Sequence, residues 1–185
     1  MFRLVAEIAS RPWQLIKMDR IGPDIFVTHW MLFFPTLMRK LCRHKLASFG
    51  AGSEVRPFAY LVNTKGIYIG RNVVVRNASI LMADDREEAG EIWIEDNVLL
   101  GSGVLIYTND HETSRLGVSI MEQGYPAPSR SDSVVVESGS WIGSNAILLK
   151  GVTVGRNSVV GAGSVVTRSI PSGEVWAGVP ARKIR

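Results

Sequence analysis

The sequence has little cysteine and histidine and no long uninterrupted apolar stretch. Its single cysteine, Cys42, excludes an internal disulfide framework and is typical of a protein that folds in a reducing compartment. The N-terminal segment MFRLVAEIASRPW lacks the apolar core and cleavage site of a secretory signal, so we expect a cytoplasmic protein. The longest apolar run, residues 25–38, is broken by polar residues and a proline. It is shorter than the roughly 20 residues that a membrane-spanning helix needs.

Neither sign of charge is in large excess. The chain of 185 residues, enough for one domain, carries 21 Lys and Arg against 17 Asp and Glu, a formal net charge of +4. The resulting sequence pI of about 9.5 allows anionic partners. Because the sequence holds no nucleic-acid-binding motif, we expect a phosphorylated small molecule or an anionic membrane rather than nucleic acid.

What the sequence does have is a period of six in residues 136–168. One large aliphatic residue opens each hexad, at Val136, Ile142, Leu148, Val154, Val160 and Val166. The fourth place holds glycine or asparagine, at Gly139, Asn145, Gly151, Asn157 and Gly163. The fifth place is mostly small, at Ser140, Ala146, Val152, Ser158 and Ser164. A period of six fits neither a helix nor a strand and indicates a solenoid.

This spacing predicts a triangular prism of stacked coils. The aliphatic residue points into the core, and the chain turns at the Gly or Asn, which tolerate a left-handed backbone at least cost. Three hexads close one coil, and coils stack at the strand spacing of about 4.8 Å. Because no coil buries its own core, the array must be continuous and capped. The sequence therefore predicts a mainly β fold of about five coils. Its hand does not follow from general rules.

The hexads run back to Phe49 and divide the chain into three parts. The first three coils open at Phe49, Val55, Leu61, Ile69, Val75, Leu81, Ile94, Leu100 and Ile106. We expect a β-helix over residues 46–171, with turn residues Asn97, Gly103 and Asn109 in the third coil. Residues 112–134 interrupt the hexads and form a long loop, which is typical of a functional element on a rigid scaffold. We expect the tail, residues 172–185, to leave the prism as a cap formed by a closing strand or short helix.

Residues 1–45 show helical rather than hexad spacing. We expect helices that start near Ser10 and near Asp24 and that cap one end of the prism, with Pro35 splitting the second helix. A basic cluster, Arg39, Lys40, Arg43, His44 and Lys45, follows the apolar segment WMLFF. Such a helix can lie in a membrane interface. The alternative is that it packs on the prism or on a partner subunit.

These motifs resemble a known family. The hexads, the NDH of residues 109–111, the block WIGSNAILLKGVTVGRNSVVGAGSVVTRSIP and the ending AGVPARKIR are similar to the hexapeptide-repeat acyltransferases. Within them the chain looks most like the sugar O-acetyltransferases. FGAGSEVRPFAYLV, EQGY and the helical N-terminus favour the branch that acetylates lipopolysaccharide, capsule or exopolysaccharide over the galactoside and maltose branch. The resemblance implies a left-handed parallel β-helix, acetyl-CoA as co-substrate without a metal, and a homotrimer with active sites between subunits.

Acetyl transfer to a sugar hydroxyl requires a base, because a hydroxyl is a poor nucleophile at neutral pH. His111 is the only histidine of the repeat region, and the resemblance implies that it removes the proton. Asp110, Glu112 and a backbone carbonyl remain open as the group that orients its imidazole. The acceptor candidates are Asn77, Asp84 and Asn109, of which Asn109 fits a turn role first.

The resemblance assigns the acetyl-CoA contacts to positions near the C-terminal end of the prism. They are Trp141, Ser144, Ala162, Thr167, Arg168, Arg182 and Arg185. Backbone N–H groups of residues 141–144 are candidate donors to the oxyanion of the tetrahedral intermediate. The arginines suit CoA phosphates, since a guanidinium fork matches phosphate oxygens. Trp141 as outer-wall packing and the arginines as a solvated basic tail are the alternatives.

Other functions fit this fold less well. An N-acetyltransferase acting on an amino-sugar nucleotide has the same co-substrate and remains an alternative. A metal enzyme such as the γ-type carbonic anhydrase needs three histidines on the prism, and this prism has one. A scaffold without activity would not need His111 beside a complete CoA block.

Overall fold

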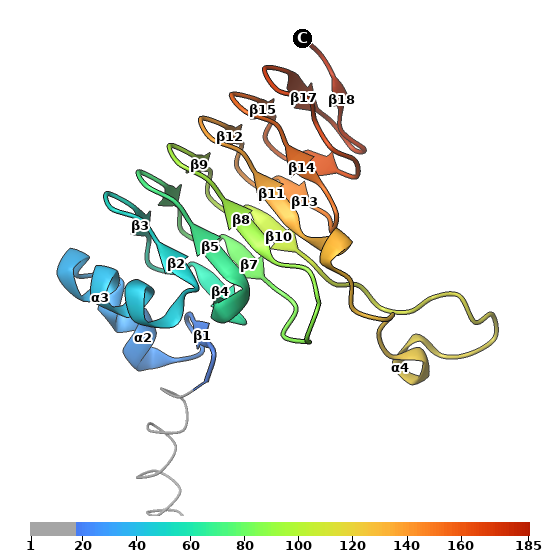
Figure 1. Cartoon of the computed structure of the whole chain (residues 1–185), viewed down its shortest axis with the longest axis horizontal. Coiled ribbons are helices and arrows are strands. Elements are labelled where there is room, and N and C mark those ends of the chain that lie inside the picture. The colour runs from blue at the N-terminus through green and yellow to red at the C-terminus, as the bar shows by residue number, and fades with distance from the viewer. Residues whose placement is uncertain (1–17) are drawn as a thin grey trace, which may run out of the picture.

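The computed structural model describes residues 18–185, which form a three-sided prism of stacked coils (Figure 1). The expected helix near Ser10 lies outside the described residues. Sheet A contains β1 (Arg20–Ile21), β4 (Tyr60–Val62), β7 (Ile80–Met82), β10 (Leu105–Tyr107), β13 (Ile147–Leu148) and β16 (Val165–Val166). Sheet B contains β2 (Ser48–Phe49), β5 (Ile67–Ile69), β8 (Ile92–Ile94), β11 (Val134–Val136) and β14 (Thr153–Val154). Sheet C contains β3 (Glu54–Val55), β6 (Val74–Val75), β9 (Leu99–Leu100), β12 (Trp141–Ile142), β15 (Val159–Val160), β17 (Val175–Ala177) and β18 (Arg182–Lys183).

Each coil runs through sheets B, C and A in that order, so the prism has a B–C, a C–A and an A–B edge. The residues that open the hexads stack in register, as in the pairs Leu81↔Ile106 and Ile106↔Leu148 of sheet A. These side chains are fully buried, whereas Phe49 of the first coil is only partly buried. The core predicted from the period of six is confirmed.

The fourth place of the hexads turns the chain, as predicted. Gly139, Asn145 and Asn157 have φ of 78°, 57° and 57°, in the left-handed region. Asn109 differs, because it is not among the described residues with positive φ. The chain leaves the prism there instead of turning into a new coil, so the prediction of a turn at Asn109 is wrong.

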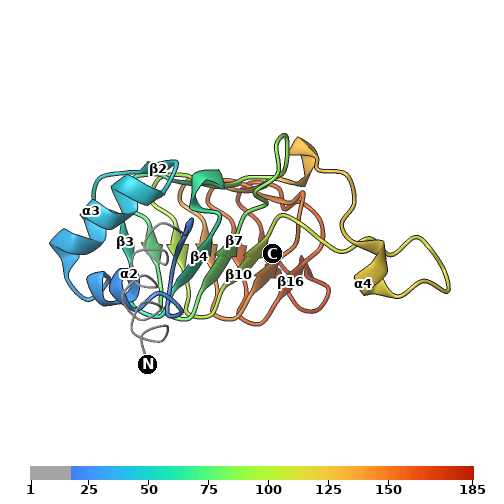
Figure 2. The ribbon, with the colours of Figure 1, turned by 90° about the horizontal axis from the view of Figure 1, so that it is seen from below.

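The N-terminal end of the prism is covered by two short helices, α2 (Phe26–Met31) and α3 (Pro35–Lys45) (Figures 1 and 2). Pro35 stands at the start of α3, so it separates the two helices as expected. Asp24 does not cap α2. Its carboxylate accepts hydrogen bonds from Arg20 and Tyr60, at 3.0 Å each. The sequence pattern did not predict β1, which pairs antiparallel with β4.

The C-terminal tail continues the prism further than predicted. β17 pairs in parallel with β15, with Trp176 in register with Val160, and Ile170 bridges Val154. A sixth, partial coil therefore stacks on the fifth, and the expectation that the chain leaves the prism after Pro171 is wrong. The closing element is the strand β18, antiparallel to β17, and the buried Trp176 ring covers the end of the core.

The long loop stands away from the prism between the third and fourth coils (Figures 1 and 2). It contains α4 (Ile120–Gln123) and a 3-10 turn at Arg130–Asp132, and it ends where β11 begins at Val134. The loop leaves from the C-terminal end of β10, on the A–B edge. None of the helices in residues 18–185 has the length and apolar character to cross a bilayer.

Candidate active site

A pocket of about 520 Å³ lies on the A–B edge where the long loop leaves the prism. It brings together three of the predicted site residues, Asn109, His111 and Thr167. Asp110, Tyr125 and Lys150 also line it. The base, one acceptor candidate and one CoA candidate therefore share one pocket within a single chain.

One wall of this pocket is a ladder of outward-facing residues on sheet A, one from each of four coils. Met82, Tyr107, Leu149 and Thr167 each follow the buried residue that opens its hexad. Because neighbours on a strand face opposite sides, this second place points out of the prism. The first three of these residues were not predicted as site residues. Their place in the hexad, beside the edge that carries His111, is the signal that identifies them.

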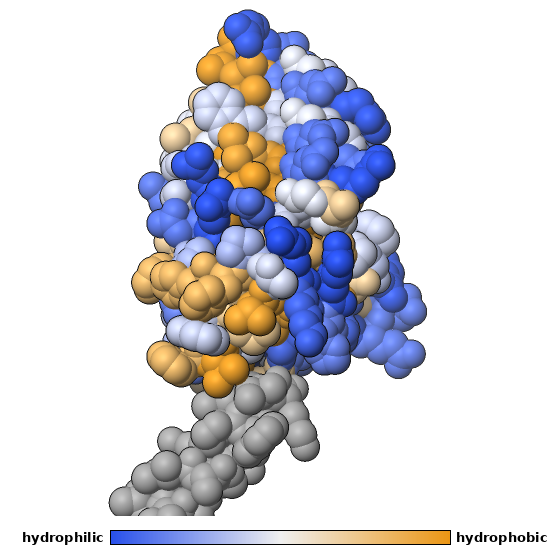
Figure 3. Space-filling model, turned by 90° about the vertical axis from the view of Figure 1, so that its left-hand side faces the viewer, coloured by the Kyte–Doolittle hydropathy of each residue, from blue (hydrophilic) through white to orange (hydrophobic). Residues whose placement is uncertain are grey.

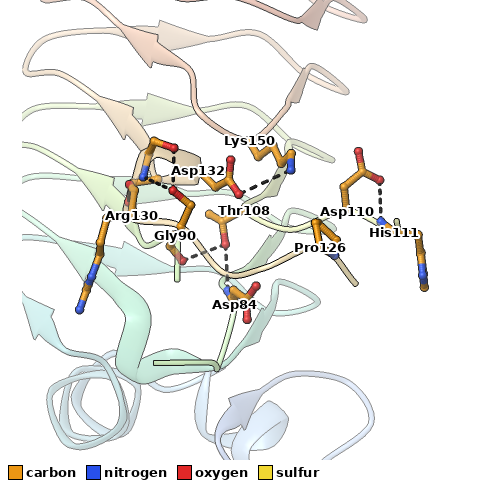
Figure 4. Close-up of polar contacts among 12 residues, drawn as sticks. Asp84, Gly90, Thr108, Asp110, His111, Pro126, Arg130, Asp132 and Lys150 are labelled. Atoms are coloured by element: carbon orange, nitrogen blue, oxygen red, sulfur yellow. Dashed lines mark hydrogen bonds and ion pairs between the residues drawn. The ribbon is translucent and has the colours of Figure 1, made fainter. Parts of the chain in front are cut away.

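His111 sits just beyond the end of β10. Its backbone N–H donates to the Asp110 carboxylate at 2.9 Å (Figure 4). Its ring stacks on Tyr125 with centroids 4.7 Å apart and an interplanar angle of 25°. The Glu112 carboxylate accepts from the backbone N–H groups of Thr113 and Ser114, which lowers the pKa of Glu112. Neither carboxylate is hydrogen-bonded to the imidazole. Among the described residues, Tyr125 is the aromatic partner that fixes the plane of the ring.

Arg86 holds Tyr125 in place, although the sequence alone did not predict this role. Its guanidinium donates to the Asp84 carboxylate from Nε at 3.0 Å and Nη2 at 2.5 Å, and to the Pro126 carbonyl from Nη1 at 2.6 Å. The same group lies over the Tyr125 ring, 5.6 Å from its centroid. Arg86 therefore ties the loop of residues 83–90 to the loop that carries Tyr125.

Asp84 has partners that differ from the sugar hydroxyl predicted for it. Its side chain is 3% exposed and is bound by Arg86, and its backbone N–H donates to the Thr108 hydroxyl at 2.8 Å (Figure 4). The hydrogen bonds from Arg86 hold the pKa of Asp84 below its usual value. Asp84 therefore holds Arg86 in position and does not line the pocket of His111.

The far end of the loop is tied to the prism by ion pairs. The Arg130 guanidinium contacts Glu91 at 2.5 Å. Lys150 Nζ lies 3.5 Å from the Asp132 carboxylate (Figure 4). Lys150 also lines the pocket, so one side chain joins the pocket wall to the returning end of the loop.

Asn77 lies on a different edge from His111. It follows β6 on the C–A edge, where its Oδ1 accepts from the Ser102 hydroxyl at 2.9 Å. It lines a separate hollow of about 470 Å³ with Arg56, Phe58 and Arg76. Within one chain, Asn77 and His111 are not brought together.

The acetyl-CoA candidates also divide between two edges. Trp141 is 51% exposed on sheet C, and Ser144 and Ala162 follow β12 and β15 on the C–A edge. The coils approach closely there, because a Cβ on Gly143 would lie 2.5 Å from the backbone nitrogen of Ala162.

The remaining candidates lie at the C-terminal end. Arg182 is exposed on β18, and Arg185 is exposed beyond it. Thr167 and Arg168 lie instead on the A–B edge with His111, and the Arg168 guanidinium stacks 5.0 Å from the Trp176 ring centroid. The candidate residues of a single chain thus lie on separate edges of the prism. Residues 18–185 contain no cluster of three or more His, Cys, Asp or Glu suited to a metal ion.

Comparison with known proteins finds a matching transferase family and similar acetyltransferases. Residues 133–168 match the family described as bacterial transferase hexapeptide (six repeats). The chain is 35% identical over 147 residues to galactoside O-acetyltransferase of Escherichia coli K12, covering 78% of this chain and 66% of that protein, just under two thirds of its length.

Two solved structures are similar over most of the chain. Galactoside acetyltransferase in complex with coenzyme A is 30% identical, with a TM-score of 0.70 and coverage of 84% of this chain and 76% of that one. A hexapeptide-repeat acetyltransferase of Vibrio cholerae O1 biovar eltor, complexed with acetyl coenzyme A, is 26% identical, with a TM-score of 0.68 and coverage of 88% of both chains. These likenesses agree with the left-handed parallel β-helix that the sequence resemblance implies.

Proposed function

Because the chain belongs to the hexapeptide-repeat acyltransferase family, we propose that it transfers acetyl from acetyl-CoA to a sugar hydroxyl, with His111 as the base. The observation that carries this proposal is the pocket on the A–B edge. It combines an imidazole stacked on Tyr125 with the outward ladder of sheet A. The similar proteins include, by name, a galactoside O-acetyltransferase and a galactoside acetyltransferase in complex with coenzyme A.

The chemistry is a direct transfer. The sugar O–H donates its proton to the His111 imidazole while the oxygen attacks the thioester carbonyl carbon. The tetrahedral intermediate carries its negative charge on the former carbonyl oxygen, for which the backbone N–H groups of residues 141–144 are the proposed donors. Collapse breaks the C–S bond, and the leaving thiolate takes the proton back from the imidazolium. The products are an acetyl ester and CoA, and no covalent enzyme intermediate forms.

We expect His111→Ala to lower kcat by about 10² to 10⁴, the usual contribution of a positioned base. Val179→Ala, at an exposed site on the tail, is the control. Turnover is measured as CoA release with acetyl-CoA and a panel of sugars. Full activity of His111→Ala would overturn the assignment of the base.

We further propose a homotrimer whose active sites lie between subunits. The base stands on the A–B edge, whereas Trp141, Ser144 and Ala162 stand on sheet C and the C–A edge. A contact between two different edges is head-to-tail, and such contacts close into a ring when the rotation allows. Three copies are the number that the sequence resemblance implies. Arg182 and Arg185 of the same neighbouring copy then face the CoA phosphates.

Mixed assemblies test the shared site. His111→Ala and Ala162→Trp each inactivate one half-site, and the two inactive chains are mixed by co-expression or by refolding together. If each site takes its edges from two chains, about a quarter of the sites regain both intact edges, because each edge is intact in half of the chains. Sites built within one chain would regain no activity.

The acceptor that we propose is a sugar of a surface polysaccharide, such as lipopolysaccharide, capsule or exopolysaccharide, acetylated in the cytoplasm. The support is the sequence resemblance of the N-terminal part and of the EQGY loop to that branch. The second candidate, N-acetylation of an amino-sugar nucleotide, gives a different product. An ester is cleaved by mild base and an amide is not, so base treatment of the product decides between them.

A further inference from the structure

The outer side of α2 and the turn that follows it expose a set of large apolar side chains, which we name the aromatic surface. It consists of Phe26, Val27, Trp30, Phe33 and Phe34. Phe26 is 78%, Trp30 49% and Phe33 52% exposed. Figure 3 shows apolar side chains gathered on the lower left of this face of the molecule. Monomeric soluble proteins rarely leave such contiguous patches uncovered, so the aromatic surface indicates a binding site.

Most of the aromatic surface does not hold α2 on the prism; among its described ring contacts, the one that reaches the prism is that of Phe33 with Phe58, 6.2 Å between centroids. Ile25, Thr28 and Leu32 are the buried residues of this segment, and they face the opposite way. Trp30 and Phe34 pack on each other, with ring centroids 4.7 Å apart and both rings still exposed. Phe26, Trp30 and Phe34 are therefore exposed to a partner outside the chain.

Positive charge borders the aromatic surface. Lys40 and Arg43 are exposed on successive turns of α3. A groove of about 770 Å³ runs between the two helices. Apolar side chains, among them Val27, Met31 and Leu41, form part of its lining, while Lys40, Lys45, Lys65 and one acid, Asp19, supply charge. Asp19 is engaged by the Thr64 hydroxyl and by the backbone N–H of Lys65.

The aromatic surface also lies away from the pocket of His111. α2 and α3 lie at the first coil, whereas the pocket of His111 lies beside the loop after the third coil (Figure 1). In any cyclic assembly of parallel prisms, all copies of the aromatic surface are on the same side. One flat partner can then bind all of them at once, which raises the overall affinity without new contacts.

We propose that the aromatic surface and its basic border bind the surface of a bilayer that contains anionic phospholipid. Trp and Phe are the side chains that settle at the boundary between headgroups and acyl chains, and Lys and Arg attract anionic headgroups. The helices lie in the plane of the interface and do not span it, in agreement with the length of α2 and α3. This inference does not depend on which acetyl acceptor the protein uses.

The test is co-sedimentation of the purified full chain with phosphatidylcholine vesicles with and without 30 mol% phosphatidylglycerol. We expect binding to the anionic vesicles that falls as salt rises from 50 to 500 mM. Lys40→Gln with Arg43→Gln should weaken the partition coefficient by about 25-fold, since one basic residue near the surface contributes about fivefold. Phe26→Ser with Trp30→Ser should abolish binding.

A matched control is Val179→Ser, which removes an apolar side chain, 72% exposed, from the other end of the prism and should bind as the natural chain does. Circular dichroism checks that each variant is folded. No binding of the natural chain to anionic vesicles would overturn the proposal, as would equal binding of the Phe26→Ser and Trp30→Ser variant. A change of oligomeric mass in that variant by light scattering, without vesicle binding, would mean that the surface joins copies of the chain.

Discussion

Removing the ion pair between Arg86 and Asp84 should have two separate effects, because the pair supports both the fold and the position of Tyr125 beside His111. We consider Arg86→Met, which keeps the length of the side chain and removes its charge. The Asp84 carboxylate is 3% exposed and then retains the backbone N–H of Arg86, at 3.0 Å, as a donor. The Pro126 carbonyl loses its charged donor at the same time.

The magnitude follows from the burial of the two partners. Breaking a fully buried ion pair costs about 3–5 kcal/mol, because it leaves one charge without compensation. The Arg86 side chain is 33% exposed, so water reaches part of the pair, and we expect a loss of about 2 kcal/mol in the free energy of unfolding. Asp84→Asn combined with Arg86→Met removes the unpaired charge and should recover about half of this loss.

Activity should follow a different pattern from stability. Without Arg86, Tyr125 is no longer held against the His111 ring, and a misplacement of about 1 Å can lower the rate by up to 10²-fold. We expect kcat/KM to fall at least tenfold in both the single and the double variant. Urea unfolding at one protomer concentration and steady-state kinetics measure the two effects. Natural activity in Arg86→Met, or full recovery of activity in the double variant, would refute the role of Arg86 in positioning the base.

Three further predictions concern stability. Because Arg86 lowers the pKa of Asp84, this carboxylate stabilises the fold at pH values above its ordinary pKa of about 4, and the stabilisation is lost as the pH falls through its lower folded pKa. The free energy of unfolding measured between pH 5 and 2 should show this loss. The pH dependence should be absent in Asp84→Asn. Gly163→Ala should lower the free energy of unfolding by about 1 kcal/mol from backbone strain alone, since φ is +67° and a Cβ there has no neighbour within 4 Å. Gly143→Ala should lower it much further, because the added Cβ would lie 2.5 Å from the backbone nitrogen of Ala162. Leu148→Ala should cost about 2–5 kcal/mol by leaving a cavity between two coils, and an unchanged urea midpoint would contradict the stacked core.

Most of the prism could be predicted from the sequence because each coil contacts only the coils next to it. The residues that open the hexads, from Val55 to Val166, are buried as the period of six requires, and the predicted Gly and Asn corners other than Asn109 take positive φ. Such contacts repeat along the chain, so a single sequence displays them many times. β17 could not be predicted in this way because the hexad count is lost between Val166 and Trp176, although the pairing with β15 continues.

The site was harder to predict than the fold because its contacts do not repeat. His111 is found through its motif, and the ladder of Met82, Tyr107 and Leu149 can be found from the second place of the hexad. Arg86 and Tyr125 belong to two irregular loops separated by 39 residues in sequence (125 − 86) and joined by one guanidinium. Nothing periodic marks either residue, so their pairing required the three-dimensional structure.

Residues that break the hexad pattern therefore mark contacts that do not repeat along the chain, and Phe58 is the clearest example. It stands in the fourth place of its hexad, where most other turns have Gly or Asn and the next coil has Ala78, and it holds φ of +67°. A left-handed backbone costs a bulky residue roughly 1–2 kcal/mol. Its ring contacts those of His29 and Phe33, with centroids 4.7 and 6.2 Å apart, and each aromatic pair contributes about 0.5–1.5 kcal/mol. The cost of the left-handed backbone and the gain from the ring contacts nearly balance. The strained corner therefore persists because it fastens the segment of α2 to the prism. Phe58→Asn should accordingly change the free energy of unfolding by less than about 1 kcal/mol while releasing α2, which limited proteolysis near residues 26–34 would detect. If the variant stays as protease-resistant as the natural chain, Phe58 is not the fastening residue.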